Sequence, residues 1–215
     1  MAGKTVISEA HIRDALRRGL RTMTIAPNAL VTPLAADAAR AGGLALQRGT
    51  PDLAPSAHAD HAAPPKSLAI GSDHGGYAMK TELIPVLEKA GYHVLDVGTD
   101  APTSCDYPDF AYGVARMVSS GRTRLGIMID GAGIGSAMVC NKVPGIRAAC
   151  AYNEFTAWNA RAHNNANVLT LGSRTLGIEV VKRIVDVFLT TDFEGGRHAA
   201  RIAKLTDIET RFARD

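Results

Sequence analysis

From Ser67 onward the chain alternates between short apolar runs and amphipathic stretches, and this alternation constrains the fold more than any other feature. Each apolar run has the length of a buried strand, and each stretch after it has the length of a helix. Such a repeat is typical of a parallel sheet with helices on both faces. We therefore expect an α/β fold whose five strands are Leu68–Gly71, His93–Val97, Leu125–Ile129, Arg147–Ala151 and Asn167–Leu171.

The third expected strand leads into the sequence Asp130-Gly-Ala-Gly-Ile-Gly, in which Gly131, Gly133 and Gly135 alternate before a helix-compatible run. Glycines let backbone N–H groups approach a ligand closely, and a helix N-terminus adds partial positive charge. A carboxylate beside such donors suits removal of a proton and stabilisation of the resulting oxyanion. The glycine pattern alone is a weak motif, because it is neither the dinucleotide fingerprint nor a P-loop.

Ligands of open parallel sheets bind outside the carboxyl ends of the strands. This rule selects Asp73 and His74 after the first strand, Asp130 after the third, and Arg174 after the fifth. We expect the segment before the fifth strand, which begins with His163, to gather along the same edge. Taken singly, Asp73 is better explained as a helix N-cap and His74 as a solvated turn residue.

The bulk composition excludes several classes of protein. A net charge of +3, without basic runs interleaved with aromatics, argues against nucleic acid as a partner. No apolar stretch reaches the length of about 18 residues that a membrane span needs, so no membrane partner is expected. The N-terminus lacks a secretory apolar core, which predicts a cytoplasmic protein. Cys105, Cys140 and Cys150 have no metal-type spacing and are expected to be reduced thiols.

The chain divides into three segments by pattern. Residues 1–47 carry two helical patterns and one short strand, Met23 to Ile25, and form a small α-rich N-terminal extension. Residues 48–66 are rich in Ala and Pro without periodicity, which predicts a flexible linker. His58, Asp60 and His61 lie in this linker, where a metal site would not be preorganised. Residues 67–215 form the main α/β domain.

Five motifs in the main domain resemble the ribose-5-phosphate isomerase B family, which includes the galactose-6-phosphate isomerase subunits. They are GSDHGGYAMK, CDYPDFA, NKVPGIRAA, HNNANVLTLGSR and FEGGRHAARI, in order from Ser67 to Arg211. The resemblance implies a Rossmann-like five-stranded parallel sheet. It also implies interconversion of aldose and ketose phosphates, without metal or organic cofactor, in homodimers or homotetramers whose sites lie between subunits.

The resemblance also implies a role for each matching residue. His163 opens the sugar ring with help from Asp73 at the ring oxygen. Asn164 and the amides of Gly131 to Gly135 hold the enediolate oxygens. The remaining positions bind substrate: Tyr107 lines the sugar, and the phosphate is taken by His74, Arg197, Arg201 and Arg174. Arg197 and Arg201 are four residues apart and so share a helix face, and guanidinium groups match phosphate geometry.

The sequence departs from the family at position 130, where the catalytic base is expected. The ribose enzymes often have Cys where this chain has Asp130, and another branch uses a Glu where this chain has Ser136. Asp at this position resembles the galactose-6-phosphate type, and Ala132 replaces a hydroxyl residue common in the ribose enzymes. We expect Asp130 to be the base and Cys140 to pack in the core. The substrate therefore stays open between a phosphorylated pentose, most simply ribose 5-phosphate, and a tetrose or hexose phosphate.

The N-terminal extension has a separate, shorter resemblance. ISEAHIRDALRRG and APNALVTPLAADAAR are similar to segments on enzymes of bacterial microcompartments, notably of the ethanolamine-utilisation type. This implies attachment to a microcompartment shell through residues 1–47, and location inside it as an alternative to free cytoplasm. The simpler alternative is an extension that strengthens an oligomer. A non-catalytic sugar-phosphate binding or scaffold protein is the competing class, and loss of Asp130, His163 or Arg197 would have favoured it.

Overall fold

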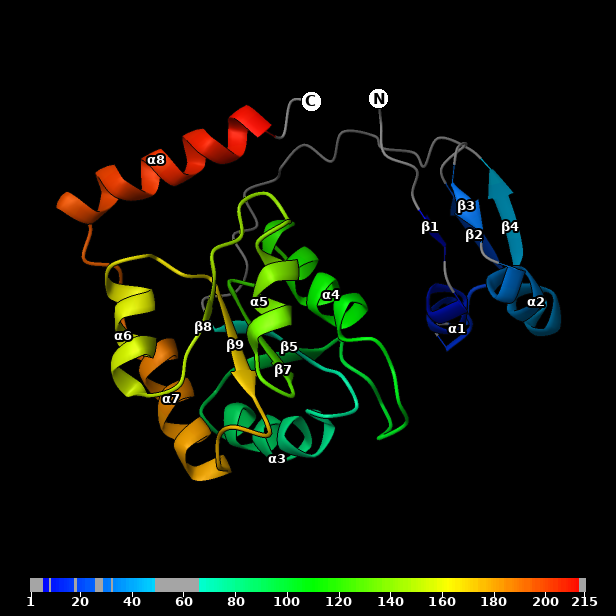
Figure 1. The fold of residues 1–215 in the computed structure, drawn as a ribbon. Coiled ribbons are helices and arrows are strands. Elements are labelled where there is room, and N and C mark those ends of the chain that lie inside the picture. Colours follow the sequence, from blue (N-terminus) through cyan, green and yellow to red (C-terminus); the bar gives the residue numbers. More distant parts are fainter. Residues whose placement is uncertain are drawn as a thin grey trace. The chain divides into compact units, whose positions relative to one another are not determined.

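The structure is a computed structural model of the 215-residue chain. Residues 1–60 and 61–215 form two compact units (Figure 1). The predicted linker, residues 48–66, lies outside the described residues except for Arg48 and Lys66, and so do His58, Asp60 and His61. The described residues are 6–7, 9–17, 19–25, 29–31, 33–48 and 66–212.

The second unit is built on the five-stranded parallel sheet that the sequence predicts. Its strand order is β6-β5-β7-β9-β8, and every neighbouring pair runs parallel. The three central strands, β5, β7 and β9, are buried along their whole length. The strands span β5 Ser67–Ser72, β6 His93–Asp96, β7 Leu125–Asp130, β8 Ala148–Cys150 and β9 Val168–Gly172.

Helices cover both faces of this sheet. Leu83, Ala157 and Phe188 place α3, α6 and α7 against one face, which includes Ile127. Val114 and Cys140 place α4 and α5 against the other face. The helices span α3 Tyr77–Lys89, α4 Tyr107–Ser119, α5 Ile134–Cys140, α6 Glu154–Ala162, α7 Ile178–Thr190 and α8 Arg197–Phe212. The five strands agree with their predicted bounds to within one residue at each end, and Cys140 packs in the core as predicted.

The chain reverses its direction of travel across the sheet between β5 and β7. From β5 it moves outward to β6, and it then returns to the other side of β5 to form β7. Such a switch point opens a crevice at the carboxyl ends of the two strands, because their connections leave in opposite directions. Glycine lets α4 approach the sheet closely near this end: a Cβ on Gly71, next to the last residue of β5, would lie 2.7 Å from Val114 Cγ2.

The first unit contains more strands than the sequence predicts. Its two helices and the strand near Met23 to Ile25 are present, and three further short strands accompany them. The strands pair in parallel as β1 with β3 and β2 with β4 around a small apolar core that includes Ile12 and Ala35. The elements span β1 Val6–Ile7, α1 Glu9–Arg17, β2 Thr22–Ile25, β3 Leu30–Val31, α2 Pro33–Gly42 and β4 Ala45–Arg48. Within the described part of the chain, no helix is long and apolar enough to span a membrane.

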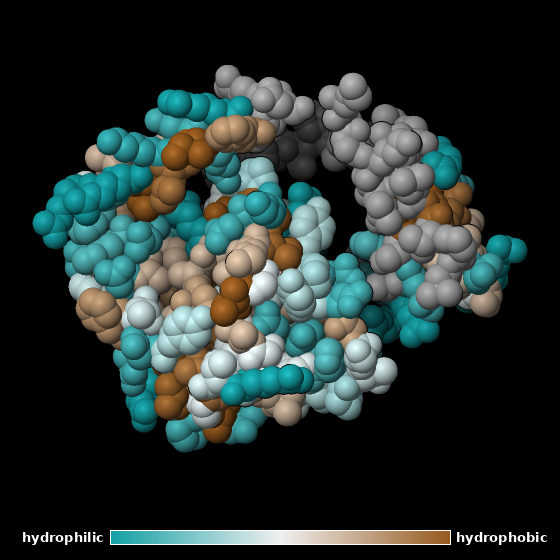
Figure 2. Space-filling view, viewed as in Figure 1, coloured by the Kyte–Doolittle hydropathy of each residue, from teal (hydrophilic) through white to brown (hydrophobic). Residues whose placement is uncertain are grey.

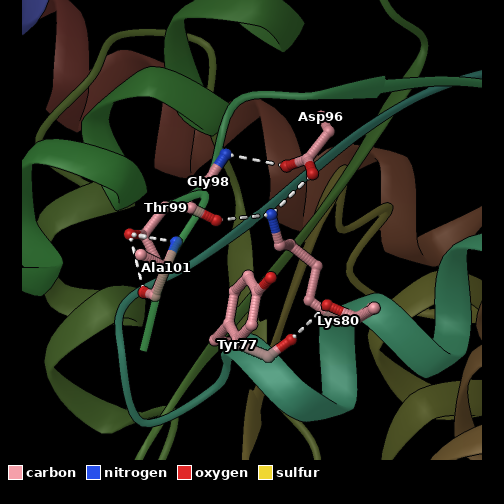
Figure 3. A network of polar contacts seen from close by, with 7 residues as sticks. Tyr77, Lys80, Asp96, Gly98, Thr99 and Ala101 are labelled. Carbon is pink, nitrogen blue, oxygen red and sulfur yellow. Dashed lines mark hydrogen bonds and ion pairs between the residues drawn. The ribbon is translucent and has the colours of Figure 1, made fainter. Parts of the chain in front are cut away.

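A buried lysine ties α3 to the loop that follows β6 (Figure 3). The Lys80 side chain is 3% exposed, and its Nζ donates to Asp96 Oδ2 at 2.5 Å and to the Thr99 carbonyl at 2.8 Å. Asp96 Oδ1 accepts from the Gly98 N–H at 2.9 Å, and the Tyr77 ring centroid lies 5.8 Å from Nζ. This loop continues to the start of α4, so the network fixes the segment that enters the crevice.

The substitution Lys80→Met keeps the length of the side chain but removes three donors. The Thr99 carbonyl then loses its charged partner, while Asp96, being 40% exposed, regains water. We expect the free energy of unfolding in urea to fall by about 1–3 kcal/mol. Lys89→Met, at an exposed position of the same helix, is the matched control and should change it by less than about 0.5 kcal/mol. Equal effects of the two substitutions would contradict the role given to the buried network.

Candidate active site

Two buried carboxylates lie at the switch point. Asp130 ends β7 with 5% of its surface exposed, and Asp73 follows the neighbouring β5 with 7% exposed. Asp73 Oδ1 accepts from the Gly76 N–H at 3.0 Å, so its side chain closes the turn before α3. Buried charges need hydrogen-bonding partners, and each of these two carboxylates finds them in the loop that follows its own strand.

The Asp130 carboxylate is turned into the glycine loop. Oδ1 accepts from the Ala132 N–H at 2.8 Å and from the Gly133 N–H, and Oδ2 accepts from the Ser136 N–H at 3.2 Å and from the Ser136 hydroxyl. Gly133 adopts a left-handed φ of 79°, and a Cβ there would lie 2.8 Å from Cys150 Sγ. We expected the backbone N–H groups of this loop to face an enediolate. Two of them, from Ala132 and Gly133, instead donate to Asp130. A carboxylate at a strand end can reach the first turn of the next helix.

The wall of the crevice beside the glycine loop comes from the segment before α4. Half-exposed Tyr107 lies over the loop, because a Cβ on Gly135 would be 2.6 Å from Tyr107 Cζ. His74 Nδ1 lies 3.2 Å from both the backbone N and the backbone O of Cys105, and 4.0 Å from its Sγ. Any larger residue at position 135 would displace the tyrosine, so glycine is required there for contact with the ring.

The turn after β9 closes the other side of the crevice. Ser173 N–H donates to the Asp130 carbonyl at 2.8 Å, and Ser173 Oγ donates to the Gly75 carbonyl at 2.8 Å. Arg174 N–H donates to the Gly131 carbonyl at 3.1 Å, and a Cβ on Gly131 would lie 3.8 Å from Arg174 Nε. The guanidinium group therefore stands beside the first glycine of the loop.

The structure brings eight of the predicted site residues together at the carboxyl edge of the sheet. We call them the carboxyl-edge cluster: Asp73, His74, Tyr107, Asp130, Gly131, Gly133, Gly135 and Arg174.

The expectation that His163 and Asn164 share this edge is wrong for a single chain. They follow α6 and precede β9, so they lie at the amino end of that strand, whereas Asp130 lies at the carboxyl end of the adjacent β7. A strand of this length spans roughly 17 Å. Arg197 follows α7, which also returns to the amino edge, and Arg201 lies one turn further along α8.

A second cluster of polar side chains forms at this amino edge. His163 stacks on His198 with ring centroids 4.0 Å apart, and His163 Nε2 lies 3.5 Å from Glu194 Oε2. Arg197 Nε donates to His198 Nε2 at 3.4 Å. Glu194 is itself held in place, since its N–H donates to the Ala162 carbonyl at 3.0 Å. The amino-edge cluster consists of His163, Asn164, Glu194, Arg197, His198 and Arg201.

Burial and neighbouring charges disfavour the protonated form of His198. Burial lowers the pKa of His198, and the neighbouring His163, Arg197 and Arg201 lower it further, while Glu194 acts in the opposite direction. The ligand atoms of His163, Glu194 and His198 lie within 4.8 Å of one another, which is the spacing of a metal site. The two rings are only 11° from parallel, however, so their in-plane lone pairs run side by side and do not converge on one ion.

Sequence reasoning missed several residues of these clusters. His198 and Glu194 stand next to predicted residues in one motif, and that adjacency was the available signal. Tyr152 follows the carboxyl end of β8, and the strand-end rule could have found it. Tyr152 belongs to neither cluster, and its pKa is raised by interaction with Cys150, by loss of solvation and, least, by the charge of Asp130. Cys140, by contrast, is inert, because burial raises its pKa to about 12.

Known proteins resemble the second unit in sequence and in fold. Residues 68–205 match the family described as Ribose/Galactose Isomerase. The chain is 42% identical to ribose-5-phosphate isomerase B of Escherichia coli, over 68% of this chain and 98% of that protein. It is 40% identical to D-erythrulose-4-phosphate isomerase of Pectobacterium atrosepticum, over 65% of this chain and 92% of that protein. The solved structure of ribose-5-phosphate isomerase B from Clostridium thermocellum superimposes with a TM-score of 0.67 at 48% identity, covering 68% of this chain and 99% of that one.

The chain belongs to the ribose/galactose isomerase family. It is accordingly a sugar-phosphate isomerase, and its sheet is the Rossmann-like sheet of that family. The match lies entirely within the second unit, so the first unit is an addition to the isomerase domain.

Proposed function

We propose that the chain interconverts ribose 5-phosphate and ribulose 5-phosphate, in a site built from the carboxyl-edge cluster of one copy and the amino-edge cluster of a second copy. The observation that carries this proposal is the division of the site residues between opposite edges of one sheet. Neither cluster is sufficient alone. The first holds the carboxylates and the glycine loop, and the second holds the paired arginines and imidazoles.

The proposed chemistry is a proton transfer through a cis-enediolate. After ring opening, Asp130 takes the proton from C2 of the aldose and returns it to C1, while the hydroxyl proton of O2 moves to O1. Bound sugar has to draw at least one oxygen of Asp130 away from the donors of Ala132, Gly133 and Ser136. Those donors then become available to the developing oxyanion, with Asn164 on its other side. The same groups therefore serve the carboxylate in the free protein and the enediolate during the reaction.

The phosphate and the ring are assigned to the remaining residues. His163 donates at the ring oxygen with Asp73 beside it, and Tyr107 lines the sugar. The phosphate is bound by Arg197 and Arg201 of one copy, and the partners from the other copy are His74 and Arg174. Guanidinium groups bind phosphate through paired charged hydrogen bonds, each worth about 1.5–3 kcal/mol.

The helix α8 is the element through which we expect two copies to associate. It projects from the rest of the domain with Leu205, Ile208 and Phe212 exposed (Figures 1 and 2). A groove of about 1190 Å³ lies between α8 and the body, and its walls include Ile146 and Phe155. An exposed apolar helix beside an apolar groove is self-complementary under two-fold symmetry, so the expected occupant is α8 of a second copy, in a homodimer or in each half of a homotetramer.

The first unit supports a separate role in assembly. It has an apolar core of its own that includes Ile7 and Leu44, and it lies outside the part of the chain that matches the isomerases. We propose that residues 1–47 attach the enzyme to the shell of a bacterial microcompartment, as their sequence resemblance implies. Catalysis does not require this unit, because both clusters lie in the second unit.

A phosphorylated tetrose is the alternative substrate. Asp130 stands where the ribose enzymes often have Cys, and one relative at 40% identity is an isomerase of D-erythrulose 4-phosphate. A hexose phosphate is a further alternative, because Asp at position 130 resembles the galactose-6-phosphate type.

The substrate proposal is tested by kcat/KM on tetrose, pentose and hexose phosphates under the same conditions. We expect ribose 5-phosphate to exceed the others by at least about tenfold, because one carbon more or less in a pocket is worth about 10–200-fold. Arg197→Ala should raise KM for every substrate alike and so serves as the control for phosphate binding. A preference for erythrulose 4-phosphate would establish the alternative, and no turnover of any sugar phosphate by the intact chain would contradict the proposed function.

The base is tested by exchange of the substrate C2 proton with deuterated solvent. Asp130→Asn removes the base and should cut both exchange and kcat by about 10²–10⁴-fold. Because the substitution also disturbs the loop, Ser136→Ala is the matched control: it removes a hydroxyl donor from the same carboxylate and leaves the base in place. It should retain exchange. Parent-rate exchange in Asp130→Asn would exclude Asp130 as the base.

A further inference from the structure

Four side chains lie against the imidazole of His163 at the amino edge. Its ring stacks on His198 and meets the edge of Trp158, with centroids 4.0 Å and 4.9 Å away. Its Nδ1 lies 2.9 Å from Asn159 Nδ2, and its Nε2 lies 3.5 Å from Glu194 Oε2. With the ring turned over, carbon atoms would face both polar partners, so the contacts fix the orientation of the ring.

A backbone carbonyl fixes the orientation of the Asn164 and Asn159 side-chain amides. Asn164 Nδ2 donates to the Asn159 carbonyl at 3.2 Å, and this carbonyl can only accept. The same nitrogen donates to Asn159 Oδ1 at 3.1 Å, so the atom of Asn159 that faces it must be the oxygen. The other terminal atom of Asn159 is therefore its NH₂ group, and that group faces His163.

The direction of these hydrogen bonds determines which nitrogen of His163 carries hydrogen. The NH₂ group of Asn159 can only donate, so His163 Nδ1 must accept and can carry no hydrogen. A neutral imidazole then has its hydrogen on Nε2, and Glu194 is the acceptor that lies beside Nε2. A protonated ring would set two donors against each other at the 2.9 Å contact.

We propose that Asn159 fixes His163 as the neutral tautomer with its hydrogen on Nε2, so that His163 meets the sugar as a hydrogen-bond donor. Asn159 is thus a positioning residue that acts through His163. The consequence for catalysis rests on the proposed function: a bare Nε2 would repel the lone pairs of a ring oxygen, whereas an N–H group there stabilises the charge that develops as the ring opens. Asn159 lies on α6, and His163 is the residue that caps this helix four positions later. This spacing lets the two side chains meet.

The test replaces the donor that Asn159 presents to His163 Nδ1 by an acceptor in a side chain of the same shape. In Asn159→Asp both terminal atoms accept, so the bond from Asn164 survives while Nδ1 of His163 must now carry hydrogen. Asn153→Asp is the matched control, because it makes the same substitution at the exposed N-cap of the same helix. The tautomer is read from the imidazole ¹⁵N spectrum of protein labelled at histidine, and the signals of His163 are identified by their loss in His163→Gln.

We expect the parent and Asn153→Asp to show hydrogen on Nε2 with Nδ1 bare, and Asn159→Asp to show hydrogen on Nδ1. We expect kcat of Asn159→Asp to fall at least about tenfold relative to Asn153→Asp, with KM less affected. Hydrogen on Nδ1 in the parent, or an unchanged spectrum in Asn159→Asp, would overturn the assignment. Equal kcat in the two variants would overturn its catalytic role.

If Asn159→Asp does not fold, the spectrum of the parent protein still decides the tautomer. The second variant is then Asn159→Leu, which removes the donor without adding charge and should give a mixture of tautomers. A failure of the proposed function is separable from these outcomes, because it would appear as a parent that turns over no sugar phosphate yet keeps its hydrogen on Nε2.

Discussion

All five strands of the isomerase domain run in one direction, and this constraint decides at which edge of the sheet each site residue lies. Parallel strands cannot be joined by tight turns, so a helix must return the chain to the starting edge after each strand. Residues after a strand therefore gather at the carboxyl edge, and residues after a helix gather at the amino edge. Asp130 belongs to the first group and His163 to the second. The proposal that two copies share each site is the consequence of this separation.

The glycine loop stabilises the Asp130 carboxylate in the free protein. Asp130 is nearly buried, and a bare carboxylate there would be costly, yet four donors from Ala132, Gly133 and Ser136 satisfy it. These interactions oppose its action as a base, since each one stabilises the charge that a base must give up. The proposed chemistry resolves the conflict by exchange: as substrate oxygens enter, they take over donors from the carboxylate. The arrangement also explains why the loop needs a left-handed glycine at position 133.

The sequence predicts the fold of the second unit well, because strand and helix periods in long segments leave few alternatives. Seven residues of the carboxyl-edge cluster were predictable for the same reason, since strand ends such as Asp130 and Arg174 share an edge, whereas Tyr107 came from the family resemblance. His163 was misplaced because the strand-end rule was extended to a residue that precedes its strand. The two-residue strands at Val6 and Leu30 are too short to show any period. The contact of Asn159 with His163 depends on hydrogen-bond polarity, which no spacing pattern reveals.

The sharing of sites between copies can be measured by mixing two inactive variants. Asp130→Asn disables the carboxyl-edge cluster and His163→Gln disables the amino-edge cluster. In a mixed dimer both substitutions fall in one site and the other site is intact. Random reassortment of equal amounts should therefore restore about a quarter of the parent activity, since half of the dimers are mixed and each has one intact site of two. Activity that stays at the level of the separate variants after confirmed subunit exchange would contradict the account, because it would mean that each chain completes its own site.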